Sequence, residues 1–94
     1  MRIDGLIWHQ FVEDKLWTKH RVTRSEVEEV FDGQPRYRFM EGGDYAGEDV
    51  YAAFGRTQAG RYLTVFFIYK SNCKAIPISA RKMTERERRS YGRK

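Results

Sequence analysis

Cysteine, histidine and long apolar runs are scarce in this sequence, and each shortage excludes a class of protein. The single cysteine, Cys73, excludes an internal disulfide and a metal site built from several cysteines. The two histidines, His9 and His20, have no carboxylate at a trustworthy ligand spacing, so we expect no metal and no other cofactor. No apolar run approaches the roughly 20 residues that span a bilayer, and the N-terminus lacks the apolar stretch of a secretory signal. We therefore expect a cytoplasmic protein that does not enter a membrane.

Length and charge indicate one small basic domain. The 94 residues suffice for a single modest core, so residues 1–94 are expected to form one domain. The net charge of +5 lies wholly in residues 81–94, where seven Lys or Arg side chains face two Glu, while the first 80 residues are formally neutral. A charge confined to one short segment after a strand predicts a surface that binds an anion, and phosphate is the obvious candidate.

Two N-terminal helices are predicted from spacing and capping. Trp8, Phe11, Val12 and Leu16 follow a spacing of three to four positions, which predicts a helix with one buried face over residues 10–20. Thr23 and Glu26 then form a T-x-x-E capping box, the start of a second helix that ends near residue 32. The two helices are expected to form a hairpin whose apolar side chains must pack against another element.

That element is predicted to be a sheet. A short strand over residues 2–8 precedes the helices, and strands over 36–40, 50–56, 61–70 and 73–80 follow them, with a Gly-rich acidic loop over 41–48. The run 61–70 is apolar on both faces, which is typical of a central strand, and Pro77 predicts an irregularity in the last strand. A second capping box, Thr84 with Glu87, begins a helix over 85–91 with little apolar surface. We expect an α+β fold, an antiparallel sheet of four to five strands covered by the helical hairpin, with a basic C-terminal helix.

Several side chains suit phosphate chemistry, although each has a structural explanation too. Arg56 and Arg61 flank a four-residue turn, and Arg81 ends the last strand. The three guanidiniums can therefore gather at one end of the sheet to bind phosphate, or each can simply lie in solvent at the end of its strand. Lys19 and His20 offer an acid or base beside a cation, and they equally suit the negative end of a helix dipole. Tyr91 can stack on a base, donate a proton or pin the last helix.

Three motifs together resemble the BrnT toxins of bacterial toxin-antitoxin pairs, members of the RelE-like ribonuclease superfamily. They are Trp8 and K-H at 19–20 before V-x-x-x-E-V-x-x-V-F over 22–31, then G-R-T-x-x-G-R-x-L-x-V over 55–65, and above all I-S-A-R-K-M-T-x-R-E-R-R-x-Y over 78–91. The resemblance covers nearly the whole chain in order, and the last motif is the specific one.

The resemblance implies a metal-independent RNA endonuclease that blocks translation by cutting RNA. Its partners would be RNA and a DNA-binding antitoxin like BrnA, with operator DNA bound only through the toxin-antitoxin complex. The ribose 2′-hydroxyl would attack the adjacent phosphate. The implied catalytic residues are Lys19, His20, Arg61, Arg81 and Tyr91, and the implied RNA-binding residues are Arg56, Lys82, Arg86 and Arg89.

A second function class fits the same sequence. In this alternative the chain is a non-catalytic partner whose basic C-terminal helix docks onto an acidic antitoxin segment or onto nucleic acid. It predicts salt-dependent binding without turnover, whereas the first hypothesis predicts RNA fragments ending in a 2′,3′-cyclic phosphate.

Overall fold

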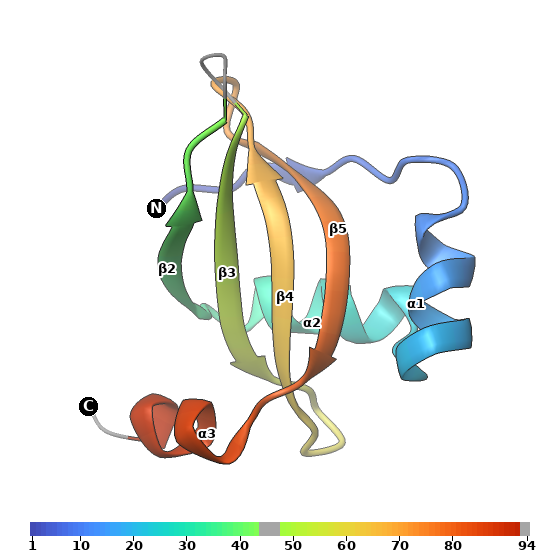
Figure 1. The fold of residues 1–94 in the computed structure, drawn as a ribbon, viewed down its shortest axis with the longest axis vertical. Coiled ribbons are helices and arrows are strands. Elements are labelled where there is room, and N and C mark those ends of the chain that lie inside the picture. The colour runs from blue at the N-terminus through green and yellow to red at the C-terminus, as the bar shows by residue number, and fades with distance from the viewer. Residues whose placement is uncertain (44–47, 93–94) are drawn as a thin grey trace.

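The computed structural model describes residues 1–43 and 48–92, in which three helices pack against one five-stranded sheet (Figure 1). The elements follow in the predicted order, and the strands lie side by side in the order β1-β5-β4-β3-β2. Arg93, Lys94 and the middle of the predicted loop 41–48 lie outside the described residues. The elements are β1 (Gly5–Leu6), α1 (Val12–His20), α2 (Arg24–Asp32), β2 (Arg36–Glu41), β3 (Asp49–Arg56), β4 (Tyr62–Tyr69), β5 (Lys74–Lys82) and α3 (Glu85–Gly92).

The α+β fold class is confirmed, and the sheet is mixed. Strands β2 to β5 pair antiparallel with their neighbours, but β1 pairs parallel to β5 through Gly5 opposite Lys74 and Leu6 opposite Ala75. The parallel pair joins the N-terminal segment to the last strand. The predicted irregularity at Pro77 is present, because the register between β4 and β5 shifts beside it.

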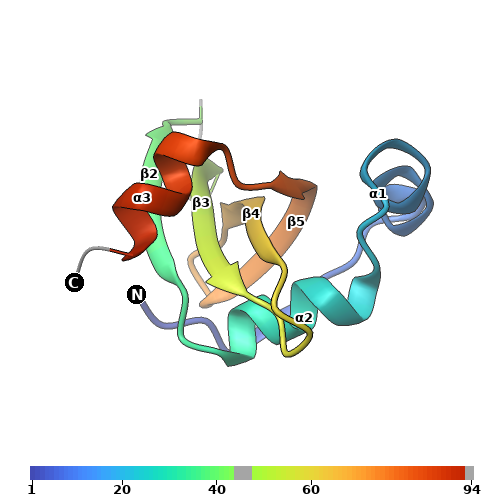
Figure 2. The same ribbon diagram turned by 90° about the horizontal axis from the view of Figure 1, so that it is seen from below.

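Helix α2 crosses one face of the sheet over β3 and β4, and α1 packs beside β5 (Figure 2). The Thr23 capping box is formed: the Glu26 N–H donates to Thr23 Oγ1 at 3.1 Å, and the Thr23 N–H donates to Glu26 Oε1 at 3.0 Å. Val27 and Val30 then face the sheet and are fully buried in one cluster with Phe67 of β4. Burial of such side chains is the main source of the domain's stability, at roughly 1.5–3 kcal/mol each.

The start of α1 differs from the prediction. Phe11 is the N-cap of the helix, adopts a left-handed conformation with φ 71°, and leaves 71% of its surface exposed. The expectation that Phe11 belongs to the buried stripe is therefore wrong, and the helix begins at Val12. Leu16, which the same spacing singled out, is fully buried.

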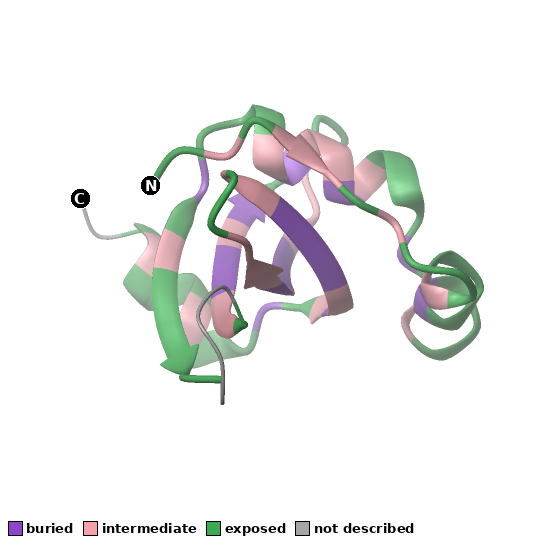
Figure 3. Cartoon of the chain, turned by 90° about the horizontal axis from the view of Figure 1, so that it is seen from above, coloured by how far each residue is buried: buried purple, intermediate pink, exposed green. Residues whose placement is uncertain are grey.

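Helix α3 lies across the opposite face of the sheet from α2, at the end where β3 and β5 finish (Figure 2). None of its described residues is buried, as the sequence predicted for a helix with little apolar surface. Burial concentrates on β3, β4 and β5, while β2 is mostly exposed (Figure 3). Within residues 1–43 and 48–92, no helix has the length and apolarity needed to cross a membrane.

Candidate active site

A hollow of about 610 Å³ lies where the end of α1, the start of α2 and the ends of two strands meet. We call it the junction hollow. Helix α1 ends at His20 because Arg21 adopts a left-handed conformation with φ 53°, and its N–H donates to the Trp17 carbonyl at 2.9 Å. This turn brings half-buried His20 into the wall of the hollow. The lining residues are Trp17, His20, Arg21, Thr23, Glu26, Arg61 and Lys82.

Arg61 is held in the junction hollow by a carboxylate and a carbonyl. Its Nη1 donates to Glu26 Oε1 and Oε2 and to the Arg21 carbonyl, each at 2.8 Å. Its backbone N–H donates to the hydroxyl of buried Thr57 at 3.0 Å. Within residues 1–43 and 48–92, Nε and Nη2 of Arg61 donate to no protein acceptor. The guanidinium therefore keeps donors for an incoming anion, on a side chain whose position is already fixed.

Glu26 remains ionised in this setting. Partial burial raises its pKa, but the hydrogen bond from the Thr23 N–H and the pairing with Arg61 lower the pKa further, so the net change is below the ordinary value. The carboxylate thus caps α2 and orients Arg61 at the same time.

Two further side chains complete the wall of the junction hollow. Lys82 is exposed and offers a cation, and Trp17 is 49% exposed and offers a ring on which a base can stack.

A second ionic network lies on the other face of the sheet, between β5 and α3. Arg81 pairs with Glu87 through both nitrogens, Nη1 to Oε1 at 2.7 Å and Nη2 to Oε2 at 3.0 Å. Oε1 also accepts from the hydroxyl of fully buried Thr64 at 3.0 Å and from the Thr84 N–H at 2.9 Å. Chiefly through the Arg81 pair, and against the effect of partial burial, the pKa of Glu87 falls to about 2.

Beside this network runs a groove of about 470 Å³ between α3, β2 and β3, which we call the α3 groove. It is basic and aromatic, with Arg36, Arg38 and Arg86 beside Phe54 and Tyr91. Such a combination suits single-stranded nucleic acid, because guanidiniums bind phosphates and rings stack on bases.

Arginines also stack beside the α3 groove, on Tyr62. Arg56 and Arg88 each lie over its ring, at 5.3 Å and 4.1 Å from the centroid, and Tyr91 meets the ring edge-on at 6.0 Å. A smaller recess of about 250 Å³ is lined by Arg61 and Lys82 on one side and by Tyr62 and Arg88 on the other. Arg61 and Lys82 also line the junction hollow, whereas Tyr62 and Arg88 stack on each other beside the α3 groove.

Comparison with known proteins identifies the family. The model of the family described as "Ribonuclease toxin, BrnT, of type II toxin-antitoxin system" matches residues 8–87. The chain belongs to the BrnT family. It is therefore a ribonuclease toxin, with RNA as its target and an antitoxin as its partner. The family description favours the ribonuclease over the non-catalytic alternative that the sequence left open.

A crystal structure of the Brucella abortus ribonuclease toxin BrnT shares the fold. The two chains superpose with a TM-score of 0.60 at 16% identity, over 86% of this chain and 97% of the Brucella chain. At that identity the likeness establishes the fold alone. A search of curated proteins finds no match to this chain.

The site residues predicted for this BrnT chain divide between the two faces of the sheet. His20, Arg61 and Lys82 meet in the junction hollow, whereas Arg56, Arg81, Arg86 and Tyr91 lie on the α3 side. Lys19 and Arg89 are exposed and line neither site.

The three guanidiniums do not gather in one pocket, because side chains alternate along a strand. Arg56 is opposite Tyr62 and Arg81 is opposite Thr64, so both share the face of even-numbered β4 residues. Arg61 turns to the other face and reaches Glu26 on α2.

Two residues of this BrnT chain were missed as site residues, Glu26 and Glu87. Both were read only as capping-box acids, yet each also binds an arginine from the sheet. A carboxylate that caps one N–H can still accept further hydrogen bonds. In a chain rich in arginine, the glutamate of a T-x-x-E box is therefore a candidate partner for an arginine, and the sequence shows two such boxes. Within residues 1–43 and 48–92, no group of three or more His, Cys, Asp or Glu is placed to hold a metal ion.

Proposed function

We propose that the junction hollow is the catalytic centre of a metal-independent RNA endonuclease. The observation that carries this proposal is that one hollow unites an imidazole, a pre-oriented guanidinium and an ammonium group, from His20, Arg61 and Lys82. These groups together can move a proton and stabilise charge on phosphorus.

The proposed reaction is an internal transfer at the phosphate. His20 accepts the proton of the ribose 2′-hydroxyl as its oxygen forms a bond to phosphorus. The bond from phosphorus to the 5′-oxygen breaks, and the leaving oxygen takes a proton from solvent. Arg61 and Lys82 stabilise the extra negative charge of the five-coordinate phosphorus, and the products are a 2′,3′-cyclic phosphate and a 5′-hydroxyl.

Glu26 acts by position, since it holds Arg61 at 2.8 Å and leaves other guanidinium donors for phosphate. The α3 side would hold flanking nucleotides, with Arg56, Arg81 and Arg86 on phosphates and Tyr91 on a base. The recess that Arg61 shares with Tyr62 gives RNA a route between the two sites. Exposed Lys19 and Arg89 would attract RNA at longer range.

In the cell, cutting RNA would stop translation and growth. We further propose that a BrnA-like DNA-binding antitoxin neutralises the enzyme and that their complex binds the operator. The support is the toxin-antitoxin family itself.

The test compares the two histidines. His20→Gln keeps a polar side chain and removes the titrating group, so cleavage of a short RNA in the presence of EDTA should fall about 10²- to 10⁴-fold. His9→Gln is the control, because His9 is exposed and outside the junction hollow. Product ends are read by mass spectrometry. Equal activity of the two variants, 3′-hydroxyl product ends, or loss of wild-type activity in EDTA would refute the proposed centre.

A further inference from the structure

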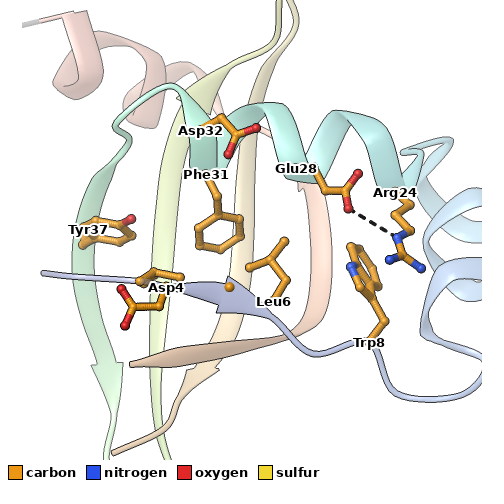
Figure 4. Close-up of a pocket in the computed structure, with 10 residues that line it drawn as sticks. Asp4, Leu6, Trp8, Arg24, Glu28, Phe31, Asp32 and Tyr37 are labelled. Atoms are coloured by element: carbon orange, nitrogen blue, oxygen red, sulfur yellow. Dashed lines mark hydrogen bonds and ion pairs between the residues drawn. The ribbon is translucent and has the colours of Figure 1, made fainter. Parts of the chain in front are cut away.

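A fourth cavity lies on the α2 face of the sheet; it shares Tyr37 with the α3 groove and no lining residue with the junction hollow. It has a volume of about 330 Å³ and is enclosed by the N-terminal segment, α2 and the start of β2. Figure 4 shows α2 along one side and β1 along the other, with Leu6 and Phe31 between them. We call it the N-terminal pocket. Ile3, Leu6 and Phe31 give it an apolar floor, and all three pack against the core.

The rim of the N-terminal pocket carries acidic side chains, in contrast to the basic α3 groove. Three carboxylates line it, those of Asp4, Glu28 and Asp32; Asp4 pairs with Arg2 at 2.8 Å and Glu28 with Arg24 at 3.4 Å. Within residues 1–43 and 48–92, Asp32 forms no ion pair. The Asp32 carboxylate therefore attracts a ligand that carries a cation.

Trp8 leaves an unpaired donor in the wall. Its Nε1–H is buried and, among the described residues, donates to no acceptor. Most buried polar groups in native proteins have a partner, so this one indicates a contact that the isolated chain does not make. The Arg24 guanidinium covers the ring at 5.2 Å from its centroid (Figure 4).

The Arg24 side chain, which covers the Trp8 ring, is held only by weak ion pairs. Its side chain is 49% exposed, and its ion pairs to Glu28 and Glu13 are long, at 3.4 Å and 3.7 Å. Exposed pairs of this kind contribute little stability. Its displacement would uncover the Trp8 ring and free Glu28 for another cation.

We propose that the N-terminal pocket is the docking site for a segment of the protein antitoxin. The segment carries an apolar side chain that fills the floor beside Leu6 and Phe31, and a neighbouring Lys or Arg that replaces Arg24 on Glu28 and pairs with Asp32. One of its backbone carbonyls accepts the Trp8 N–H. This inference rests on the family assignment, which supplies the partner, and not on the location of the catalytic centre.

Helix α2 links the pocket to the junction hollow. Arg24 and Glu28 line the pocket, and Thr23 and Glu26 line the hollow. The two cavities therefore lie on either side of the first turns of the same helix. One helical turn rises about 5.4 Å, so a segment anchored in the pocket needs only a short extension to cover the hollow. Docking here is thus compatible with neutralisation of the enzyme.

The experiment measures binding of the full chain to its protein antitoxin, by titration calorimetry. Trp8→Phe keeps an aromatic ring and removes the donor, and Asp32→Asn removes one rim charge without changing shape. Each should weaken binding roughly three- to tenfold. Asp14→Asn is the matched control, an exposed acid on α1 outside the pocket, and it should bind like the unaltered chain.

Cleavage of a short RNA by the free variants separates the outcomes. Unchanged cleavage with weakened binding supports the docking site, and Asp32→Asn carries the test if Trp8→Phe does not fold. Binding within twofold of the unaltered chain for the variants that fold overturns it, as does equal loss in Asp14→Asn. If Asp32→Asn impairs RNA cleavage instead, the pocket belongs to RNA and the proposal is wrong. If the unaltered chain does not bind that protein, the partner assignment fails while the nuclease proposal stands.

Discussion

Replacing Glu87 by Gln should destabilise the domain in a pH-dependent way. Glu87 joins α3 to the sheet, since its carboxylate accepts two hydrogen bonds from Arg81, one from Thr64 and one from Thr84. None of the described residues of α3 is buried, so this network is a principal attachment of the helix. A glutamine keeps one acceptor and loses the charge that binds Arg81 bidentately.

The magnitude follows from the lowered pKa. A folded-state pKa of about 2, against an ordinary value of 4.5, corresponds to about 3 kcal/mol of stabilisation of the ionised form. The side chains of Glu87 and Arg81 are 19% and 34% exposed, so solvent screens part of this energy. We expect a loss of roughly 1–2 kcal/mol at pH 7, which lowers Tm by about 4–16 °C in a domain of this size.

The sign of the pH dependence is fixed by the direction of the pKa change. Between pH 4.5 and 2 the unfolded chain binds the proton at Glu87 and the folded chain does not, so this contribution is complete above pH 4.5 and is lost as pH falls toward 2. The assay is urea unfolding at a series of pH values, followed by circular dichroism. Glu85→Gln is the control, because Glu85 is an exposed acid in the same first turn.

Two results would refute this reasoning. One is an equal loss of stability in Glu85→Gln and Glu87→Gln, which would assign the effect to the helix dipole. The other is a stability difference between Glu87→Gln and the unaltered chain that stays constant from pH 7 to pH 3.

Two further predictions concern the core and the junction hollow. Gly55→Ala should lower the free energy of unfolding by about 1–3 kcal/mol, because a Cβ at Gly55 would lie 2.8 Å from Cγ1 of Val30 on α2. Urea unfolding measures this change. An unchanged free energy of unfolding would mean that α2 shifts at little cost. Arg61→Lys keeps the charge, but an ammonium group cannot pair with Glu26 and also offer phosphate two parallel N–H donors. RNA cleavage should therefore fall at least about tenfold. The control Arg2→Lys, at an exposed position, should leave cleavage unchanged.

The sequence predicted the elements that depend on local chemistry. Both T-x-x-E boxes form as expected, because a cap is satisfied within four residues of chain. The two-sided apolar run 61–70 contains the central strand β4, Tyr62–Tyr69, since only burial on both faces accommodates it. The sequence motifs over 22–31, 55–65 and 78–91 indicate a ribonuclease toxin, and the family model agrees.

Tertiary structure alone decided which functional groups meet. Arg61 and Arg81 both lie at one end of the sheet, but strand alternation and the reach of Glu26 place them on opposite faces. The parallel pairing of β1 with β5 joins residues about 70 positions apart, and no local signal encodes such a contact. Capping, periodicity and charge are properties of neighbours along the chain, so they can be read from sequence; the sharing of a pocket depends on distances through space, which only the folded chain sets.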